Sequence, residues 1–125
     1  IDPILWKVDA TLYQSSIPRV IVYPIVENSI FHGILTEEKK AHVYVTIEKS
    51  DKTLIIEIRD DGHGIDPKSL AALNQGLKNG RGQEGHIGLV NVSNRLRLLY
   101  KERANLEIKS EKGKGTCVII KISHD

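Results

Sequence analysis

The sequence predicts an α/β fold, a two-layer sandwich in which helices cover one face of a mixed sheet. Three observations support it: two pairs of strand-like segments, three segments with signals of a helix, and their interleaved order. With 125 residues, 40% of them apolar and 27% charged, the chain has the size and composition of a soluble globular domain. Residues 1–125 are therefore expected to form a single domain.

The first elements expected are a strand and a helix. Apolar residues crowd into residues 4–10, ahead of a polar stretch that indicates a turn. Residues 19–33 carry apolar side chains at helical spacing, and Gly33 is a suitable stop. Because Pro24 lacks an N–H donor, the regular helix is expected to begin near Tyr23 or to kink there.

A β-hairpin and a short helix are expected next. Residues 43–47 and 54–58 alternate apolar and polar side chains on either side of a Ser-Asp-Lys turn. Asp66 followed by Pro67 is typical of a helix cap and first turn, which predicts a short helix through Leu73.

The last third of the chain is expected to hold a loop, a long helix and a second hairpin. Residues 75–86 contain four glycines and few apolar residues, which predicts a mobile lid. Residues 89–100 repeat leucine and valine at three- and four-residue steps, which indicates an amphipathic helix ending near Tyr100. Residues 104–109 and 116–122 then form the strands of the hairpin.

Composition argues against several classes of function. The formal net charge is +2 and acids interleave with bases, so no basic stripe indicates a nucleic-acid partner. The single Cys117 lies among apolar residues, where a buried, inert thiol in a reducing cytoplasm is expected. No segment resembles a membrane span or a signal peptide. Because the chain begins at Ile1 and contains no Met, we expect a segment of a longer polypeptide, whose parent can still be membrane-bound.

The first of three candidate motifs is the segment of residues 27–33, where polar side chains interrupt an apolar helix. Asn28 and His32 are four residues apart and share a helix face, so an amide oxygen and an imidazole can both point at a phosphate and its metal. An amide oxygen suits Mg²⁺, which takes hard oxygen ligands and usually retains waters. The alternative is a pair of ordinary polar residues at a helix end.

The second motif, residues 60–65, directly follows a strand and has the sequence Asp-Asp-Gly-His-Gly-Ile. Its glycines permit a sharp turn and the close approach of a flat ring, and the carboxylate of Asp60 can accept a hydrogen bond from an exocyclic amine. Adenine carries such an amine where guanine carries a carbonyl. The alternative is a plain Asp-Gly turn.

The third motif, residues 85–89, is a glycine-rich entry into the long helix, where free N–H groups and the helix dipole favour phosphate. Two glycines at a helix start are, by themselves, more often structural. In their order along the chain, the three motifs, the lid and a final strand beginning with Gly115 and Thr116 together supply sites for a metal, a base and phosphates. The P-loop string, Gly-x-x-x-x-Gly-Lys followed by Ser or Thr, is absent from the sequence.

These motifs resemble the GHKL superfamily of ATPases and kinases, which contains gyrase, heat-shock chaperones, histidine kinases and MutL. The fold implied is the Bergerat fold, with a mixed, mostly antiparallel sheet. Within the superfamily, nearly the whole chain resembles the LytS/YesM-like bacterial sensor histidine kinases. The residues that carry this likeness are Ile17 and Pro18, residues 24–28 with His32 and Gly33, residues 88–92 with Arg95 and Leu96, and Gly115 with Thr116.

The resemblance implies a role for each site residue. Asn28 would ligate Mg²⁺, and Asp60 would accept the adenine amine, with Thr116 as a second contact through water. His32 stands at a position beside the phosphates, and Arg95 either assists there or forms a helix-surface ion pair. The implied ATP-binding residues are Asn28, His32, Asp60, Gly62, Gly64, Ile65, Gly85, Ile87, Gly88, Leu89 and Thr116.

The resemblance also implies phosphoryl transfer from ATP rather than efficient hydrolysis. The gyrase-like branch carries its water-activating acid four residues before Asn28, where this sequence has Pro24. Glu27 is a candidate to polarise the nucleophile, although it projects about 100° from Asn28 around the helix. With Glu27, Asn28 and His32 as the catalytic set, the expected reaction is in-line attack of a histidine on the γ-phosphoryl group.

The acceptor histidine is expected on a separate dimerisation segment of the same kinase, from which the phosphoryl group passes to an aspartate of a response regulator. The parent is expected to be a homodimer in the bacterial cell membrane, with this domain in the cytoplasm. Two alternatives stay open: an anti-sigma serine kinase of the same superfamily, and a regulatory module that binds ATP without transferring phosphate. Pro18 and residues 27–33 favour the histidine kinase.

Overall fold

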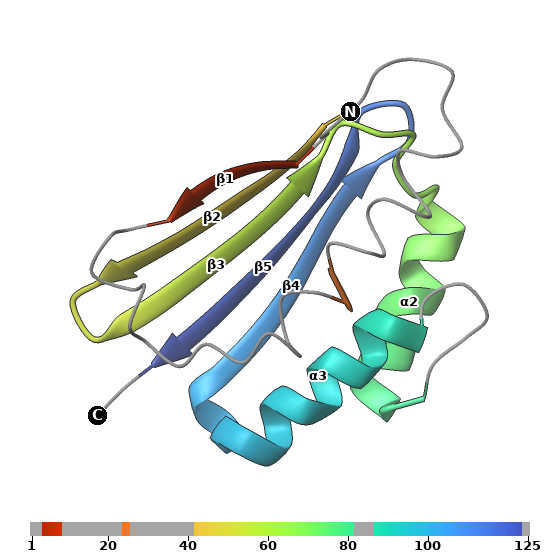
Figure 1. The fold of residues 1–125 in the computed structure, drawn as a ribbon. Helices are drawn as coiled ribbons and strands as arrows, with labels where there is room; N and C mark the ends of the chain where they lie inside the picture. Colours follow the sequence, from red (N-terminus) through yellow and green to blue (C-terminus); the bar gives the residue numbers. More distant parts are fainter. Residues whose placement is uncertain (1–3, 9–23, 26–41, 82–86, 124–125) are drawn as a thin grey trace.

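The computed structural model describes residues 4–8, 24–25, 42–81 and 87–123 (Figure 1). Its strands form one sheet in the order β1-β2-β3-β5-β4. Strand β1 runs parallel to β2, and the other neighbouring pairs are antiparallel, which confirms the expected mixed, mostly antiparallel sheet. The strands are β1 (Ile4–Val8), β2 (Val43–Ser50), β3 (Thr53–Asp60), β4 (Ala104–Glu111) and β5 (Gly115–Ser123).

Helices cover one face of this sheet in the described part of the chain (Figure 1). They are α2 (Pro67–Asn79) and α3 (Ile87–Tyr100), which the short 3-10 helix η3 (Lys101–Arg103) follows. Alternate residues of the strands are buried against them, as the period of two requires. The two-layer sandwich is therefore confirmed. The core includes Val43, Val45, Ile56, Ile58, Leu73, Leu89, Val92, Leu96, Val118 and Ile120.

The first elements agree with expectation where the structure describes them. Strand β1 matches the predicted strand, whose last position, Ala10, lies outside the described residues. The helix expected over residues 19–33 is described only at Pro24 and Ile25, which are helical. Ile25 is fully buried, so this short segment contributes to the core.

Helix α2 begins with the predicted N-cap, Asp66. The carboxylate of Asp66 accepts a hydrogen bond from the backbone N–H of Ser69 at 2.9 Å, and Pro67 is the first helical residue. This backbone hydrogen bond, with a second from the Ser69 hydroxyl, stabilises the charged carboxylate and lowers the pKa of Asp66 below its ordinary value.

The end of α2 corrects the predicted lid. Residues 75–79 belong to the helix, so the first part of the lid prediction is wrong. Gly76 is buried, and a Cβ atom there would lie 2.7 Å from the carbonyl oxygen of Arg81, so close packing explains this glycine. Gly80 ends the helix in a left-handed conformation with a φ of 70°. The rest of the expected lid, residues 82–86, lies outside the described residues.

The last elements match their predictions closely. Helix α3 ends at Tyr100 as expected, and β4 and β5 form the second hairpin, each slightly longer than predicted. Among the residues that the structure describes, no helix has the length and apolar character needed to cross a bilayer.

Candidate functional site

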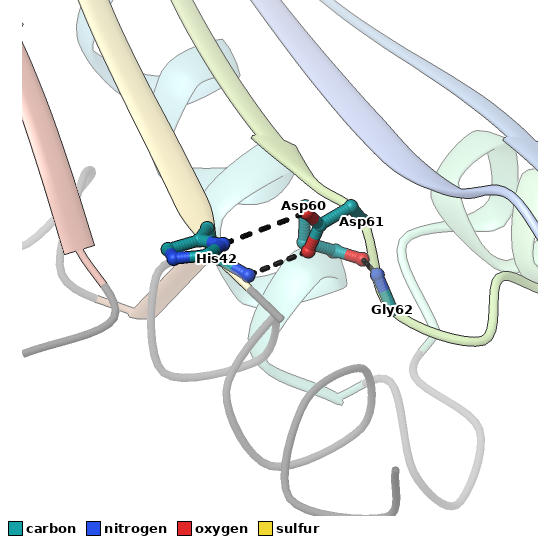
Figure 2. Close-up of polar contacts among 4 residues, drawn as sticks. All are labelled: His42, Asp60, Asp61 and Gly62. Carbon is teal, nitrogen blue, oxygen red and sulfur yellow. Dashed lines mark hydrogen bonds and ion pairs between the residues drawn. The ribbon is translucent and has the colours of Figure 1, made fainter. Parts of the chain in front are cut away.

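Asp60 lies at the end of β3, on the face of the sheet that the helices cover. The alternation of the strand places it on the same face as Ile58, and only 4% of its surface is exposed. It pairs with Val43 on β2 and with Thr116 on β5. The backbone N–H of Gly62 donates to its Oδ1 at 3.0 Å, so the turn that follows the strand holds this buried carboxylate (Figure 2).

Two glycines bring the second hairpin against this turn. At Gly64, with a φ of 74°, a Cβ atom would lie 2.1 Å from the carbonyl oxygen of Glu111. At Gly115, with a φ of 119°, a Cβ atom would lie 2.1 Å from the carbonyl oxygen of Asp60. Both positions therefore require glycine, for its backbone conformation and for the close approach of two backbone segments.

Ser110 joins the loop after β3 to the same hairpin. Its Oγ accepts a hydrogen bond from the N–H of Ile65 at 2.8 Å, donates to the carbonyl of Gly115 at 3.0 Å, and lies 2.7 Å from Oγ1 of Thr116. A hydroxyl has one proton and two lone pairs, so Thr116 supplies the proton of the third contact. The lone pairs of the Thr116 hydroxyl can then accept a hydrogen bond from a ligand.

The start of α3 is the second part of the candidate site. Ile87 is its first residue and Gly88 its second. The first N–H groups of a helix have no partner within the helix, and they favour an anion. Leu89 is fully buried in the core that also contains Ile58, two residues before Asp60. A Cβ atom on Gly88 would lie 3.9 Å from the carbonyl oxygen of Pro24, so the helical segment at Pro24 lies beside this start.

The structure assembles part of the predicted site. Two groups of predicted residues are described, and a third lies outside. The loop after β3 and the adjoining strand β5 bring together Asp60, Gly62, Gly64, Ile65 and Thr116, while Ile87, Gly88 and Leu89 lie at the start of α3. Glu27, Asn28, His32 and Gly85 lie outside the described residues. Arg95 is exposed on α3.

Three residues next to the site were not predicted: Ser110, His42 and Asp61. Ser110 occupies a helix-facing position of β4, two residues after the buried Ile108. A polar residue in the apolar register of the strand was the sequence signal that could have identified it. The other two join the ends of β2 and β3, where the backbone N–H of His42 donates to Oδ1 of Asp61 at 2.5 Å. The described residues hold no group of three or more His, Cys, Asp or Glu side chains arranged for a metal.

Cys117 is partly exposed, whereas a buried thiol was expected. It alternates with Val118 on β5, so it lies on the face of the sheet away from the helices. Its partial burial, and then the negative charge of Glu57 nearby, raise the pKa of the thiol to about 11. At neutral pH the thiol is therefore protonated, which agrees with the expected lack of reactivity.

Comparison with known proteins agrees with the motifs. The family described as Histidine kinase-, DNA gyrase B-, and HSP90-like ATPase matches residues 14–125. Sensor histidine kinase YpdA of Escherichia coli K12 is 38% identical over 86 residues, which are 69% of this chain and 14% of the relative. An uncharacterized sensor-like histidine kinase of Staphylococcus epidermidis is 31% identical over 97% of this chain and 24% of the relative. The chain thus spans less than a quarter of the length of these relatives.

Solved structures share the fold. The histidine kinase domain of the Erythrobacter litoralis EL346 blue-light activated kinase has a TM-score of 0.68 and 20% identity, over 96% of this chain and 50% of that one. The catalytic domain of histidine kinase ThkA has a TM-score of 0.64 and 11% identity, over 96% of this chain and 76% of that one. The match over most of the sequence and the likeness in fold lead to one conclusion: this chain belongs to the Histidine kinase-, DNA gyrase B-, and HSP90-like ATPase family.

Proposed function

We propose that residues 1–125 form the ATP-binding catalytic domain of a sensor histidine kinase. The domain binds Mg²⁺-ATP and donates the γ-phosphoryl group to a histidine on a separate dimerisation segment of the same kinase. The phosphoryl group then passes to an aspartate of a response regulator. Membership of the family and the sensor kinases among the relatives support this proposal.

The observation that carries the proposal is the buried carboxylate of Asp60 at the end of β3. Gly62 donates one hydrogen bond to it, and the backbone at Gly115 packs against its residue. A carboxylate accepts hydrogen bonds and cannot donate them when it is ionised. It therefore suits the exocyclic amine of adenine and opposes the carbonyl that guanine has in its place. Thr116, with its proton directed to Ser110, would accept from a water beside the base.

The remaining predicted residues would handle the phosphates and the reaction. The backbone N–H groups of Gly85, Ile87, Gly88 and Leu89, at and before the start of α3, would face the phosphates, since a helix N-terminus favours anions. Asn28 would hold Mg²⁺, which neutralises charge on the phosphate oxygens when bound.

In the reaction, a nitrogen of the acceptor imidazole attacks the γ-phosphorus. The bond from phosphorus to the bridging oxygen breaks, and ADP leaves. His32 would contact the phosphates, and Glu27 would polarise the incoming imidazole.

We also infer that the parent kinase is a homodimer anchored in the bacterial cell membrane, with this domain in the cytoplasm. This inference follows the resemblance to bacterial sensor histidine kinases, and a relative carries that name. An anti-sigma serine kinase would share the nucleotide site but transfer to serine, and a regulatory module would bind ATP without transfer.

Calorimetric titration with ATP, ADP and GTP, with and without Mg²⁺, tests the binding half of the proposal. We expect adenine-selective binding that strengthens with Mg²⁺. In Asp60→Asn, an amide replaces the charged acceptor, and we expect ATP affinity to fall at least about tenfold and the preference over GTP to disappear. Asp51→Asn makes the same chemical change in the exposed β2–β3 turn and should bind ATP as the wild type does. Unchanged ATP affinity in Asp60→Asn would exclude Asp60 as the adenine contact.

Phosphotransfer in trans tests the catalytic half. The chain is mixed with the dimerisation segment of its parent and with ATP labelled at the γ-phosphate. Acid-labile, base-stable label on that segment is expected for a phosphohistidine. Label that survives acid would indicate transfer to serine, and ATP binding without any label would favour the regulatory module.

A further inference from the structure

We propose that Asp61 is a positioning residue for the nucleotide pocket. Its carboxylate ties the loop after β3 to the start of β2, and thereby fixes the turn that orients the neighbouring Asp60. The inference rests on the proposed function, because it takes Asp60 to be the residue that contacts adenine.

The contact between Asp61 and His42 lies one step beyond the last regular pair of the β2–β3 ladder, which joins Val43 to Asp60. At the next step, the backbone N–H of Asp61 donates to the carbonyl of His42 at 3.3 Å. In a regular antiparallel pair the return bond would end on the carbonyl of Asp61. Here the N–H of His42 instead donates to the side-chain Oδ1 of Asp61 at 2.5 Å (Figure 2).

This substitution of a side-chain oxygen for a backbone oxygen frees the chain to leave the sheet. The carbonyl of Asp61 is not needed to close the pair with His42, so the backbone can turn at Gly62 while the strand ends stay joined. The turn directs the N–H of Gly62 back to Oδ1 of Asp60 at 3.0 Å. The two adjacent carboxylates therefore have complementary tasks: that of Asp61 holds β2, and that of Asp60 accepts the N–H of the turn.

The loop is positioned by the hydrogen bond from the backbone N–H of His42 to Asp61, rather than by the contact between the two side chains. Nδ1 of His42 lies 3.7 Å from Oδ2 of Asp61, and the two side chains are 44% and 40% exposed. The contact between the two side chains is an ion pair only when His42 is protonated, and at this exposure it contributes little, whereas the N–H bond to Oδ1 is directional and does not depend on the charge of the imidazole. The imidazole ring also lies 6.1 Å from the ring of Tyr44, which gives it a second neighbour on the outer face of the sheet.

Four variants separate these two contributions. Asp61→Ala removes the acceptor, and Asp61→Asn keeps an oxygen at Oδ1 without the charge. Asp61→Glu keeps the charge but moves the oxygens one methylene further out. His42→Ala removes the imidazole and keeps the backbone N–H. Each variant is titrated with ATP and GTP, and the amide hydrogen exchange of Gly62 and His42 is measured in the nucleotide-free protein.

We expect Asp61→Ala and Asp61→Glu to bind ATP about tenfold more weakly than the wild type and to lose part of the preference over GTP, a loss of one strong hydrogen bond. The N–H groups of Gly62 and His42 should exchange faster in both variants. Asp61→Asn and His42→Ala should stay within about twofold of the wild type in affinity, because the N–H bond survives. If Asp61 acted through its negative charge alone, asparagine, which is neutral, would not restore ATP affinity.

Two outcomes overturn the inference. One is wild-type ATP affinity and Gly62 exchange in both Asp61→Ala and Asp61→Glu. The other is an equal loss in Asp61→Asn and His42→Ala, which would assign the effect to the ion pair. If the wild type binds no ATP, the proposed function fails first, and the inference about the pocket fails with it. The exchange of Gly62 would then still report whether Asp61 fixes the turn.

Discussion

The two hairpins of this domain have turns at opposite ends of the sheet, and only one of the turns borders the candidate site (Figure 1). The β2–β3 turn consists of the exposed Asp51 and Lys52. Within the described residues, no hydrogen bond is seen from these two residues to another element. The β4–β5 turn, residues 112–114, lies beside the end of β3, because Thr116 pairs with Asp60.

The second turn has a task beyond reversing the chain. The N–H of Gly113 donates to the carbonyl of His63 at 2.6 Å, and Ser110 binds the N–H of Ile65 at 2.8 Å. Together with the close approach of Gly64 to Glu111, these contacts pack the β4–β5 turn against the loop that follows Asp60. Both turns are exposed, yet only the second contacts the loop that follows Asp60. Local sequence decides that a turn forms, and tertiary contacts decide whether it is part of a site.

The largest effect is expected from Gly115→Ala. The added Cβ would lie 2.1 Å from the carbonyl oxygen of Asp60, at a φ of 119° that alanine rarely adopts. We expect the free energy of unfolding to fall by about 3 kcal/mol or more, from strain and overpacking together. Urea denaturation measures this fall.

Gly113→Ala is the matched control in the same turn. Its φ is 89°, but a Cβ there would have no atom within 4 Å, so only backbone strain is added. The expected loss is about 1 to 2 kcal/mol. Equal losses in the two variants would show that the contact with Asp60 is not what requires Gly115.

A smaller effect is expected from Ser110→Ala. The change leaves the N–H of Ile65 and the hydroxyl of Thr116 without their acceptor in a partly buried place. We expect a loss of roughly 1 to 3 kcal/mol, together with weaker preference for ATP over GTP, since Thr116 is then free to rotate.

Ser50→Ala is the corresponding change at the other hairpin, at an exposed position beside the β2–β3 turn. Its expected effect is within about 0.5 kcal/mol, with no change in ATP binding. Thermal unfolding and calorimetric titration of both variants give the two numbers. A larger loss in Ser50→Ala than in Ser110→Ala would reverse the comparison between the turns.

The sequence predicted most of the fold because the signals involved are local. Alternation over residues 43–47 and 54–58 marks a hairpin regardless of what covers it, and Asp66 with Pro67 marks a helix start. The lid prediction was wrong for residues 75–79 because glycine density was interpreted as flexibility. There, Gly76 permits close packing and Gly80 caps the helix, and both functions depend on contacts that sequence spacing does not reveal.

The candidate site was predicted where a short motif names the residue, as at Asp60. Ser110 and Asp61 were missed for one physical reason. Ser110 binds Ile65, 45 residues away in sequence, and Asp61 binds His42, 19 residues away. Partners so distant leave no periodicity within one element. Only the register of the sheet, which joins β2, β3 and β5, brings these side chains together.

The smallest effect is expected from Asp51→Gly in the β2–β3 turn. Asp51 has a φ of 57°, a conformation that glycine adopts without strain. Glycine also gains entropy in the unfolded chain, so the two contributions oppose each other, and the free energy of unfolding should change by no more than about 0.5 kcal/mol. Asp51→Val is the control, because a β-branched residue at this φ is expected to cost about 1 to 2 kcal/mol. Since the turn lies at the end of β3 remote from Asp60, neither variant should alter ATP affinity, and a change in affinity without a change in stability would mean that both ends of the sheet affect the site.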